Sequence, residues 1–139
     1  MQLSNFTDYG IRVLIYLANI EQGTLSNITT VSQHYQISRN HLVKIVHRLG
    51  QLGYIDTVQG KNGGIRLKLL PKHINIGKVI RELEPLELLN CSPDACIISP
   101  ACRLKGYLVK AKEAFLQELE NYTLFDLVND NPPLRNLLE

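Results

Sequence analysis

Long hydrophobic runs and a basic start are both missing from this sequence. The first ten residues, MQLSNFTDYG, contain no Lys or Arg, and the apolar stretch that follows, VLIYLA, is only six residues long. A signal peptide or a membrane span needs a longer apolar segment. We therefore expect a cytoplasmic protein without membrane contact. Its 139 residues, 45% of them hydrophobic, suffice for one domain, with or without an appendage.

The motifs of common enzymes are also missing. The sequence contains no pairing of a nucleophile with a base and no phosphate-binding loop, and it has no internal repeat or low-complexity segment. A catalytic site is recognised by such groups at workable spacing. The sequence therefore predicts a protein that is not an enzyme.

Cysteine is scarce and confined to one segment. Cys91, Cys96 and Cys102 are separated by four and five residues, in a stretch broken by Pro93 and Pro100. A reducing cytosol disfavours a disulfide. Four interpretations stay open: buried structural thiols, a thiol redox switch, a zinc site or an iron–sulfur cluster. Because zinc ligands usually stand closer together, the spacing alone favours the cluster about as much as the other three interpretations combined.

Acidic residues are few in the first half of the chain. Residues 1–73 contain eight Lys/Arg against three Asp/Glu, whereas residues 74–139 contain seven against ten. The basic residues are densest between Arg39 and Lys68, where Asp56 is the only acidic residue. Such a local excess of positive charge suits a polyanion.

Apolar residues at helical spacing predict three helices in this half. The first begins near a Thr7 cap and ends before Gly23, the second lies within SNITTVSQHYQ, and the third runs from a Ser38 cap to Gly53. Their apolar faces are Ile11, Leu14, Ile15 and Ala18, then Ile28, Val31 and Tyr35, then Leu42, Ile45, Val46, Leu49 and Leu52. The short link before the third helix and its basic outer side indicate a helix-turn-helix with the third helix as DNA reader.

Alternating periodicity follows Gly53. YIDTV and IRLKL alternate, and the glycine-rich QGKNGG lies between them, which predicts a β-hairpin. A hairpin after a recognition helix is the wing of a winged helix, and its basic tip suits phosphate or minor-groove contact.

The DNA contacts expected from this arrangement divide into three groups. The first turns of the third helix should read bases, because they enter the major groove first. The predicted base readers are Arg39, Asn40, His41 and Lys44, the phosphate contacts are Ser38 and Arg48, and the wing contacts are Lys61, Asn62 and Arg66.

The second half of the chain predicts a helix over residues 76–83, a break at Pro85, the cysteine loop and a long amphipathic helix of about 20 residues from Cys102. The apolar stripe of the long helix is Leu104, Leu108, Ala111, Phe115, Leu119 and Tyr122. A stripe of that length needs another surface, and a second copy is the simplest one. Thr123 and Asp126 predict a capping box for a short helix ending near Val128, and NDNPPLRNLLE is expected to be a tail.

The predicted fold class is mainly α with a small β-hairpin: a winged helix-turn-helix domain plus a long C-terminal dimerisation helix. The expected divisions are a DNA-binding domain over residues 1–80, a cluster-binding loop region over 81–103, and the dimerisation helix with its tail over 104–139.

Several segments together resemble NsrR-type nitric-oxide-sensing repressors, of the winged-helix iron–sulfur regulator family that also contains IscR. They are FTDYGIRVLIYLA, SRNHLVKIVHRLGQLGYIDTVQGKNGGIRL, IGKVIRELEPL, the cysteine loop continuing as PACRLK, and ENYTLFDLV. The resemblance implies a homodimeric repressor that binds double-stranded operator DNA. It also implies an iron–sulfur cluster (4Fe-4S or 2Fe-2S) bound by the three cysteines and destroyed or nitrosylated by nitric oxide, which releases the DNA and expresses nitric-oxide detoxification genes.

The same resemblance implies that Asp8 of the other subunit completes the cluster. The residues alone favour a different role, in which the Asp8 carboxylate stabilises the positive end of the first helix or pairs with Arg12. Asp94, a histidine, or no protein ligand are the alternatives, although all four histidines lie within residues 1–73.

Two other functions remain as alternatives. A winged-helix regulator with a zinc or thiol redox switch keeps the DNA binding but not the cluster. A small iron–sulfur electron-transfer protein is less favoured, because it leaves the basic helix-turn-helix unexplained.

Overall fold

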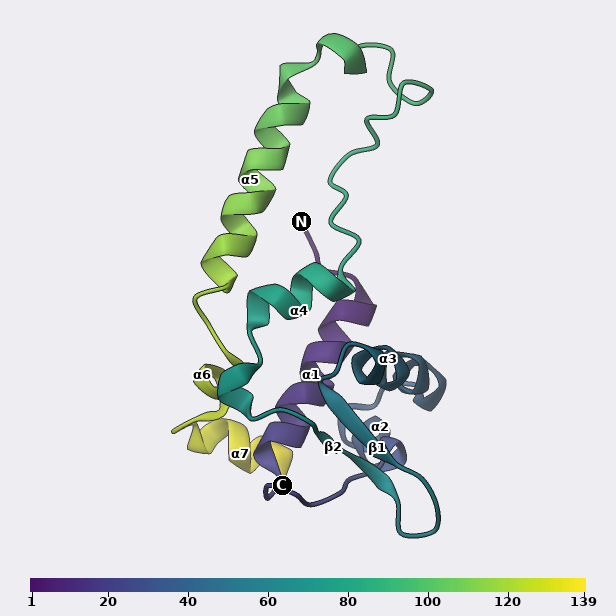
Figure 1. Ribbon diagram of the computed structural model, residues 1–139, viewed down its shortest axis with the longest axis vertical. Helices are drawn as coiled ribbons and strands as arrows, with labels where there is room; N and C mark the ends of the chain where they lie inside the picture. Colours follow the sequence, from purple (N-terminus) through teal and green to yellow (C-terminus); the bar gives the residue numbers. More distant parts are fainter.

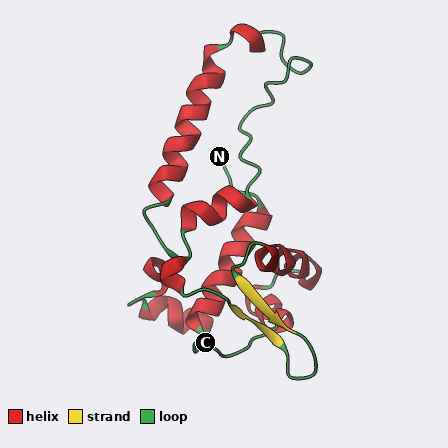
Figure 2. Cartoon of the chain, in the orientation of Figure 1, coloured by secondary structure: helices red, strands yellow, loops and turns green.

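The structure is a computed structural model that describes all of residues 1–139. Figure 1 shows a helical head that carries a β-hairpin, and an arm that extends from the head and returns to it. We use "head" for residues 1–83 and 120–139, and "arm" for residues 84–119. Strand is confined to the hairpin (Figure 2). No helix combines the length and the apolar character that crossing a membrane requires.

The central helix of the head is α1 (Asn5–Asn19). It begins at a Ser4 cap, so the predicted Thr7 cap is wrong: the Thr7 N–H donates to Ser4 Oγ at 3.3 Å, and Thr7 itself is fully buried. The predicted apolar face is also rotated. The buried residues are Thr7, Gly10, Val13, Leu14 and Leu17, whereas Ile11, Ile15 and Ala18 are half-buried. Because other elements pack around α1 on several sides, its periodicity does not mark a single inner face.

The helix-turn-helix forms as predicted. It consists of α2 (Ile28–Tyr35) and α3 (Arg39–Gln51), joined by a turn in which Gln36 is left-handed with φ 55°. Val31 on α2 is buried, as are all the predicted apolar residues of α3 except the half-buried Leu52. Ser38 stands at the N-cap of α3, but its side chain makes no capping hydrogen bond.

The wing is an antiparallel hairpin of β1 (Ile55–Val58) and β2 (Gly64–Leu67). Its base is fixed to the segment before α2, because Ser26 and Ile65 exchange backbone hydrogen bonds of 2.9 and 2.8 Å. A side chain at Gly64 would collide with the Ser26 carbonyl oxygen, so only glycine allows this approach. The predicted hairpin is therefore confirmed.

The remaining elements of the head come after the wing or after the arm in the sequence. They are the short 3-10 turn η1 (Pro71–His73), α4 (Ile76–Leu83), α6 (Leu124–Val128) and α7 (Pro132–Leu138). The Thr123–Asp126 capping box is present as predicted. The predicted tail is wrong in part, because α7 forms there: Asn131 caps it by accepting from the Leu134 N–H, and two prolines occupy its first turn, where no N–H donor is needed.

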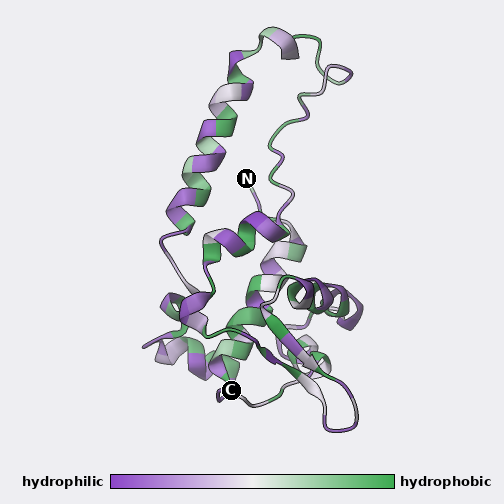
Figure 3. Cartoon of the chain, in the orientation of Figure 1, coloured by the Kyte–Doolittle hydropathy of each residue, from purple (hydrophilic) through white to green (hydrophobic).

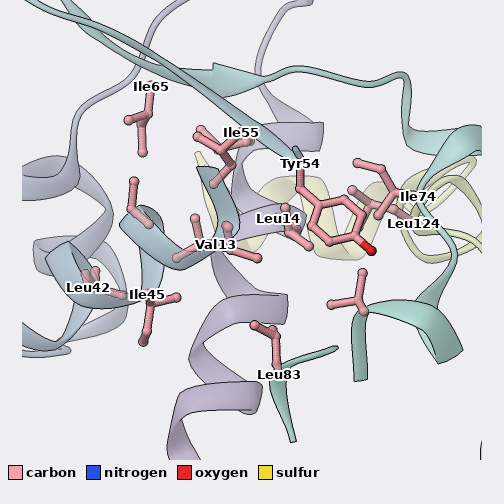
Figure 4. Close-up of a cluster of buried hydrophobic side chains, with 14 of the residues drawn as sticks. Val13, Leu14, Leu42, Ile45, Tyr54, Ile55, Ile65, Ile74, Leu83 and Leu124 are labelled. Carbon is pink, nitrogen blue, oxygen red and sulfur yellow. The ribbon is translucent and has the colours of Figure 1, made fainter. Parts of the chain in front are cut away.

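A single core joins these elements. Figure 4 shows side chains from α1, α3, the hairpin, α4 and α6 meeting around Leu14 and Val13. Tyr54 reaches into the same cluster, only 4% exposed, and its hydroxyl donates to Glu82 at 3.2 Å. The core thus extends from the helix-turn-helix and the wing to α4 and α6, and it anchors the DNA-facing elements to the rest of the head.

The arm consists of an irregular segment of bends and turns over residues 84–98, the 3-10 turn η2 (Ser99–Ala101) and α5 (Arg103–Leu119). The predicted long helix is confirmed, at 17 residues. Its predicted stripe is only partly covered within this chain: Leu104 is 51% exposed, whereas Phe115 and Leu119 are half-buried against the core. The one fully buried residue of α5 is Leu116, which the stripe did not include. Apolar and polar residues alternate along its exposed length (Figure 3).

Candidate functional site: a thiol loop and a basic head

The three cysteines belong to the loop of residues 91–102 that leads into α5, and Figure 1 shows this loop at the end of the arm farthest from the hairpin. All three are free thiols and all are half-buried. Cys102 occupies the N-cap of α5, and Cys91 lines a shallow pocket against Lys105 and Leu108 on the first turns of that helix. The loop is therefore attached directly to the start of α5.

Local hydrogen bonds shape the thiol loop. The Ser92 carbonyl accepts from the backbone N–H groups of Ala95 and Cys96, both at 3.0 Å. Ser99 is only 8% exposed, and its hydroxyl donates to the Cys91 carbonyl. Ser99 thus links the first cysteine to the turn that precedes the third.

The donor set suits an iron–sulfur cluster by its chemistry, since thiolates are the usual ligands of such clusters. The thiols are uncommitted, because none is in a disulfide. Within a single chain, however, no three Cys, His, Asp or Glu side chains converge as a metal-binding group. The loop supplies three thiol ligands in one short segment, and a fourth ligand would have to join them.

Asp8 lies in the first turn of α1, in the head rather than beside the cysteines. It forms a two-bonded ion pair with Arg12, whose Nε and terminal nitrogen donate at 2.9 and 2.8 Å. The Asp8 hydrogen bond raises the pKa of Arg12. The pair with Arg12, which the sequence offered as an alternative to ligation, is therefore present, and both side chains remain accessible at 39% and 44% exposure.

The other possible ligands are dispersed. Asp94 is exposed within the thiol loop, whereas the four histidines all belong to the head. His34 packs against both Tyr16 and Tyr35, with ring centroids 5.5 and 5.3 Å away. None of the histidines joins a metal-binding group with the cysteines.

A clamp joins the base of the arm to the head, and sequence reasoning missed it. Arg81 on α4 donates to Glu113 of α5, with one bond of 3.0 Å, and to Glu120 just beyond that helix. Asn75 donates to the Glu120 carbonyl at 2.7 Å, and Gly77 allows the Glu120 backbone to approach α4. The Arg81 hydrogen bond lowers the pKa of Glu113. These partners lie 32 to 45 residues apart in the chain, so no local spacing signals them.

A second attachment holds the other end of the arm. Glu84, the residue after α4, accepts from the Ser4 N–H at 3.0 Å and from the Ser4 hydroxyl at 2.9 Å. Burial acts to raise the pKa of Glu84, but the hydrogen bonds from Thr7 and Ser4 outweigh it and lower that pKa. The start of the arm is thereby tied to the first turn of α1, the turn that carries Asp8.

The predicted DNA-contacting residues are placed on the outside of the head. Ser38, Arg39, Asn40, His41, Lys44, Arg48, Lys61 and Asn62 are all exposed, and Arg66 is half-buried. Their side chains differ in their partners: Arg66 pairs with Asp56 at 3.2 Å, and Arg39 donates to Thr29 at 3.1 Å, whereas Lys44, Arg48 and Lys61 take part in no ion pair. A basic helix and wing of this kind can approach DNA through phosphates and base edges.

Comparisons with known proteins agree with this geometry. The family model described as "Rrf2: Iron-dependent Transcriptional regulator" matches residues 3–130. Among solved structures, CymR of Staphylococcus aureus is similar over 92% of this chain and 98% of its own, with 26% identity and a TM-score of 0.72. CymR, the global cysteine regulator of B. subtilis, is 24% identical over 94% and 98%, with a TM-score of 0.72. IscR of T. potens is 23% identical over 94% and 88%, with a TM-score of 0.73.

Proposed function

This chain belongs to the Rrf2 family of transcriptional regulators, and we propose that it is a repressor whose thiol loop senses nitric oxide through an iron–sulfur cluster. Regulators of this family bind operator DNA as dimers and are not enzymes. The observation that carries the proposal is the gathering of every cysteine of the chain, all as free thiols, in one loop at the outer end of the arm.

Cys91, Cys96 and Cys102 would hold the cluster, and Asp8 of the partner subunit would complete it. Bound there, the cluster would supply the centre at which nitric oxide reacts. A carboxylate oxygen is a harder and more labile ligand for iron than a thiolate, so Asp8 would be the first ligand to part. Released, Asp8 has Arg12 as a ready partner one turn along α1.

The arm offers a route from the loop to the DNA-binding head. Cys102 begins α5, and the other end of that helix is clamped to α4 by Arg81. Glu84 ties the start of the irregular segment of the arm to the beginning of α1, which packs against α3. A displacement of the loop would therefore reach the recognition helix through two attachments. A coupling of about 1–3 kcal/mol is enough to change operator occupancy strongly.

The proposal is tested with protein purified without oxygen. We expect a coloured, iron-containing dimer that binds its operator, and nitric oxide should bleach it and weaken operator binding, measured by fluorescence anisotropy. The control is the variant with all three cysteines replaced by serine, which should respond to nitric oxide in neither colour nor binding. Equal operator affinity of both proteins, unchanged by nitric oxide, would refute the proposal.

A thiol switch is the second candidate function. Half-buried free thiols are compatible with it, and CymR of Staphylococcus aureus has a solved oxidized form that is 26% identical to this chain with a TM-score of 0.73. Metal-free protein treated with a thiol oxidant separates the two candidates. A reversible change in operator affinity, absent from the triple-serine variant, would favour the switch, and a colourless protein containing zinc would favour a zinc site.

Two substitutions distinguish base readout from phosphate contact within the head. We expect Arg39→Ala to weaken operator binding and to flatten sequence preference, because a base contact carries sequence information. Lys61→Ala should weaken binding to all DNA alike, because phosphate contacts do not. Equal and sequence-blind losses from both variants would contradict this division.

A further inference from the structure

The side chains of Thr29 and Arg39 are joined across the helix-turn-helix. Arg39 Nε donates to Thr29 Oγ1 at 3.1 Å, between α2 and the first residue of α3. Both residues are exposed, so the contact is not forced by burial. It connects the two helices on the surface where the recognition helix begins.

This contact distinguishes Arg39 from the other arginines in the head. Arg12, Arg66 and Arg81 each pair with a carboxylate that offsets the charge, whereas the side chains of Arg48 and Arg135 form no hydrogen bond or ion pair that would orient them. Arg39 is held by a neutral hydroxyl and has no acidic partner. Its orientation is fixed while its full positive charge remains available to DNA.

The atoms used by the contact leave the recognition edge open. A guanidinium has five N–H donors, and the bond to Thr29 engages the single donor on Nε. The terminal nitrogens stay free for the two-bonded contact with the N7 and O6 of guanine. Thr29 accepts through Oγ1, so its own hydroxyl hydrogen can donate to a phosphate oxygen of the same DNA.

We infer that Thr29 is a positioning residue for sequence readout: it sets the plane of the Arg39 guanidinium before DNA arrives and couples that base contact to the backbone. The inference rests on the proposed DNA-reading role of Arg39. An arginine side chain loses much rotamer freedom when it is ordered, and a residue that orders it in advance reduces the entropy lost on binding. This saving in entropy favours the correct base pair, because only that base pair presents two acceptors to the plane of the Arg39 guanidinium.

The test compares discrimination between DNA duplexes. The duplex is the one that the full-length dimer, prepared without oxygen, selects from a randomised pool, and the competitor differs at the base pair whose identity Arg39→Ala ceases to discriminate. We expect Thr29→Val, which keeps the shape but not the hydroxyl, to lower the ratio of affinities about fivefold, with binding to unrelated DNA reduced by less than about twofold. Thr29→Ser should restore the ratio to within about twofold of the wild type.

Two controls exclude a structural explanation. Thr30→Val changes the next residue of the same helix, also exposed and with no side-chain hydrogen bond, and it should leave the ratio unchanged. The double variant Thr29→Val with Arg39→Ala should discriminate no worse than Arg39→Ala alone. Thr29→Ala is the second variant if the valine form unfolds early by thermal melting.

The outcomes separate this inference from the proposed function. If Arg39→Ala leaves discrimination intact at every position, the base-reading role of Arg39 fails. If Arg39→Ala abolishes discrimination at one base pair while Thr29→Val preserves it, the positioning role of Thr29 alone is overturned. A loss in Thr29→Val that Thr29→Ser does not restore also overturns it.

Discussion

The head buries its apolar side chains within the chain, whereas the arm leaves most of its own uncovered. Of the 19 buried apolar residues, 18 belong to the head, and the arm contributes only Leu116. Ile97 is 94% exposed, Ile98 61% and Tyr107 60%. Apolar surface gathered in this way marks a site of association. One chain therefore completes the fold of the head, while the arm needs a second surface, which fits its predicted part in dimerisation and sensing.

The largest expected effect is a truncation in the head. Leu14 is fully buried at the centre of the core, so Leu14→Ala should lower the free energy of unfolding by about 2–5 kcal/mol through lost burial and the cavity left behind. Leu104→Ala in the arm removes the same atoms from a site that is 51% exposed and should cost less than about 1 kcal/mol. Urea denaturation of dilute protein measures both, and equal costs would erase the contrast between head and arm.

A charge in the arm should act on association instead of folding. Leu104→Glu would bury a carboxylate in an interface formed by α5, and we expect the dissociation constant of the dimer to rise at least about tenfold. Sedimentation at several protein concentrations gives that constant. The matched control is Lys110→Gln, which shifts the charge of α5 by the same −1 at another exposed position. Equal effects of both substitutions would show that charge alone, and not the predicted stripe, controls dimerisation.

The sequence was informative where local signals and burial agree. The bounds of α4 were predicted as residues 76–83, because its apolar residues repeat at helical spacing ahead of Pro85, and Asn75 caps it. The apolar stripe of α3 was also correct, since that helix has one buried side and one exposed side. For α1 the same reasoning failed, because a central helix is apolar on several faces and its inner face depends on which neighbours pack against it.

The candidate site was also predictable only where its features are local in the sequence. The sequence placed all three thiols in one loop and the basic residues on one helix and a hairpin, since both are local features of the chain. It did not reveal the clamp of Arg81 with Glu113, residues 32 apart, because charged side chains without periodicity do not indicate their distant partners. The same limit applies to Asp8: its pair with Arg12 follows from a spacing of four, whereas its role as a ligand of a second chain remains a prediction.

The clamp between Arg81 and Glu113 should weaken in acid, so pH tests how firmly the arm is attached to the head. The pKa of Glu113 is lowered by Arg81, so the stabilisation is complete above the ordinary value of 4.5 and is lost as pH falls through the lowered value. We therefore expect backbone amides at the C-terminal end of α5 to exchange hydrogen faster once pH drops well below 4.5. Arg81→Met should show that fast exchange already at neutral pH and little further change in acid.

The control for the clamp is Lys78→Met on the same helix. Lys78 is 69% exposed and approaches Glu82 at only 3.9 Å, so its loss should leave exchange in α5 unchanged. If Lys78→Met and Arg81→Met behave alike, the attachment of the arm does not depend on the clamp.

The smallest effect on stability is expected at Asp8, although the residue is central to the proposed function. Its pair with Arg12 is a four-residue helix pair with both side chains well exposed, so Asp8→Asn in metal-free protein should change the free energy of unfolding by less than about 0.5 kcal/mol. The same variant should lose its colour to nitric oxide or to air at a rate clearly different from the wild type, measured by absorbance, because an amide is a poorer ligand than a carboxylate. A destabilised metal-free variant would mean that Asp8 serves the head alone. A stable variant whose absorbance and bleaching match the wild type would mean that Asp8 in the head of one subunit is not a ligand of the cluster on the arm of the other. The head and the arm would then perform their separate roles within each chain.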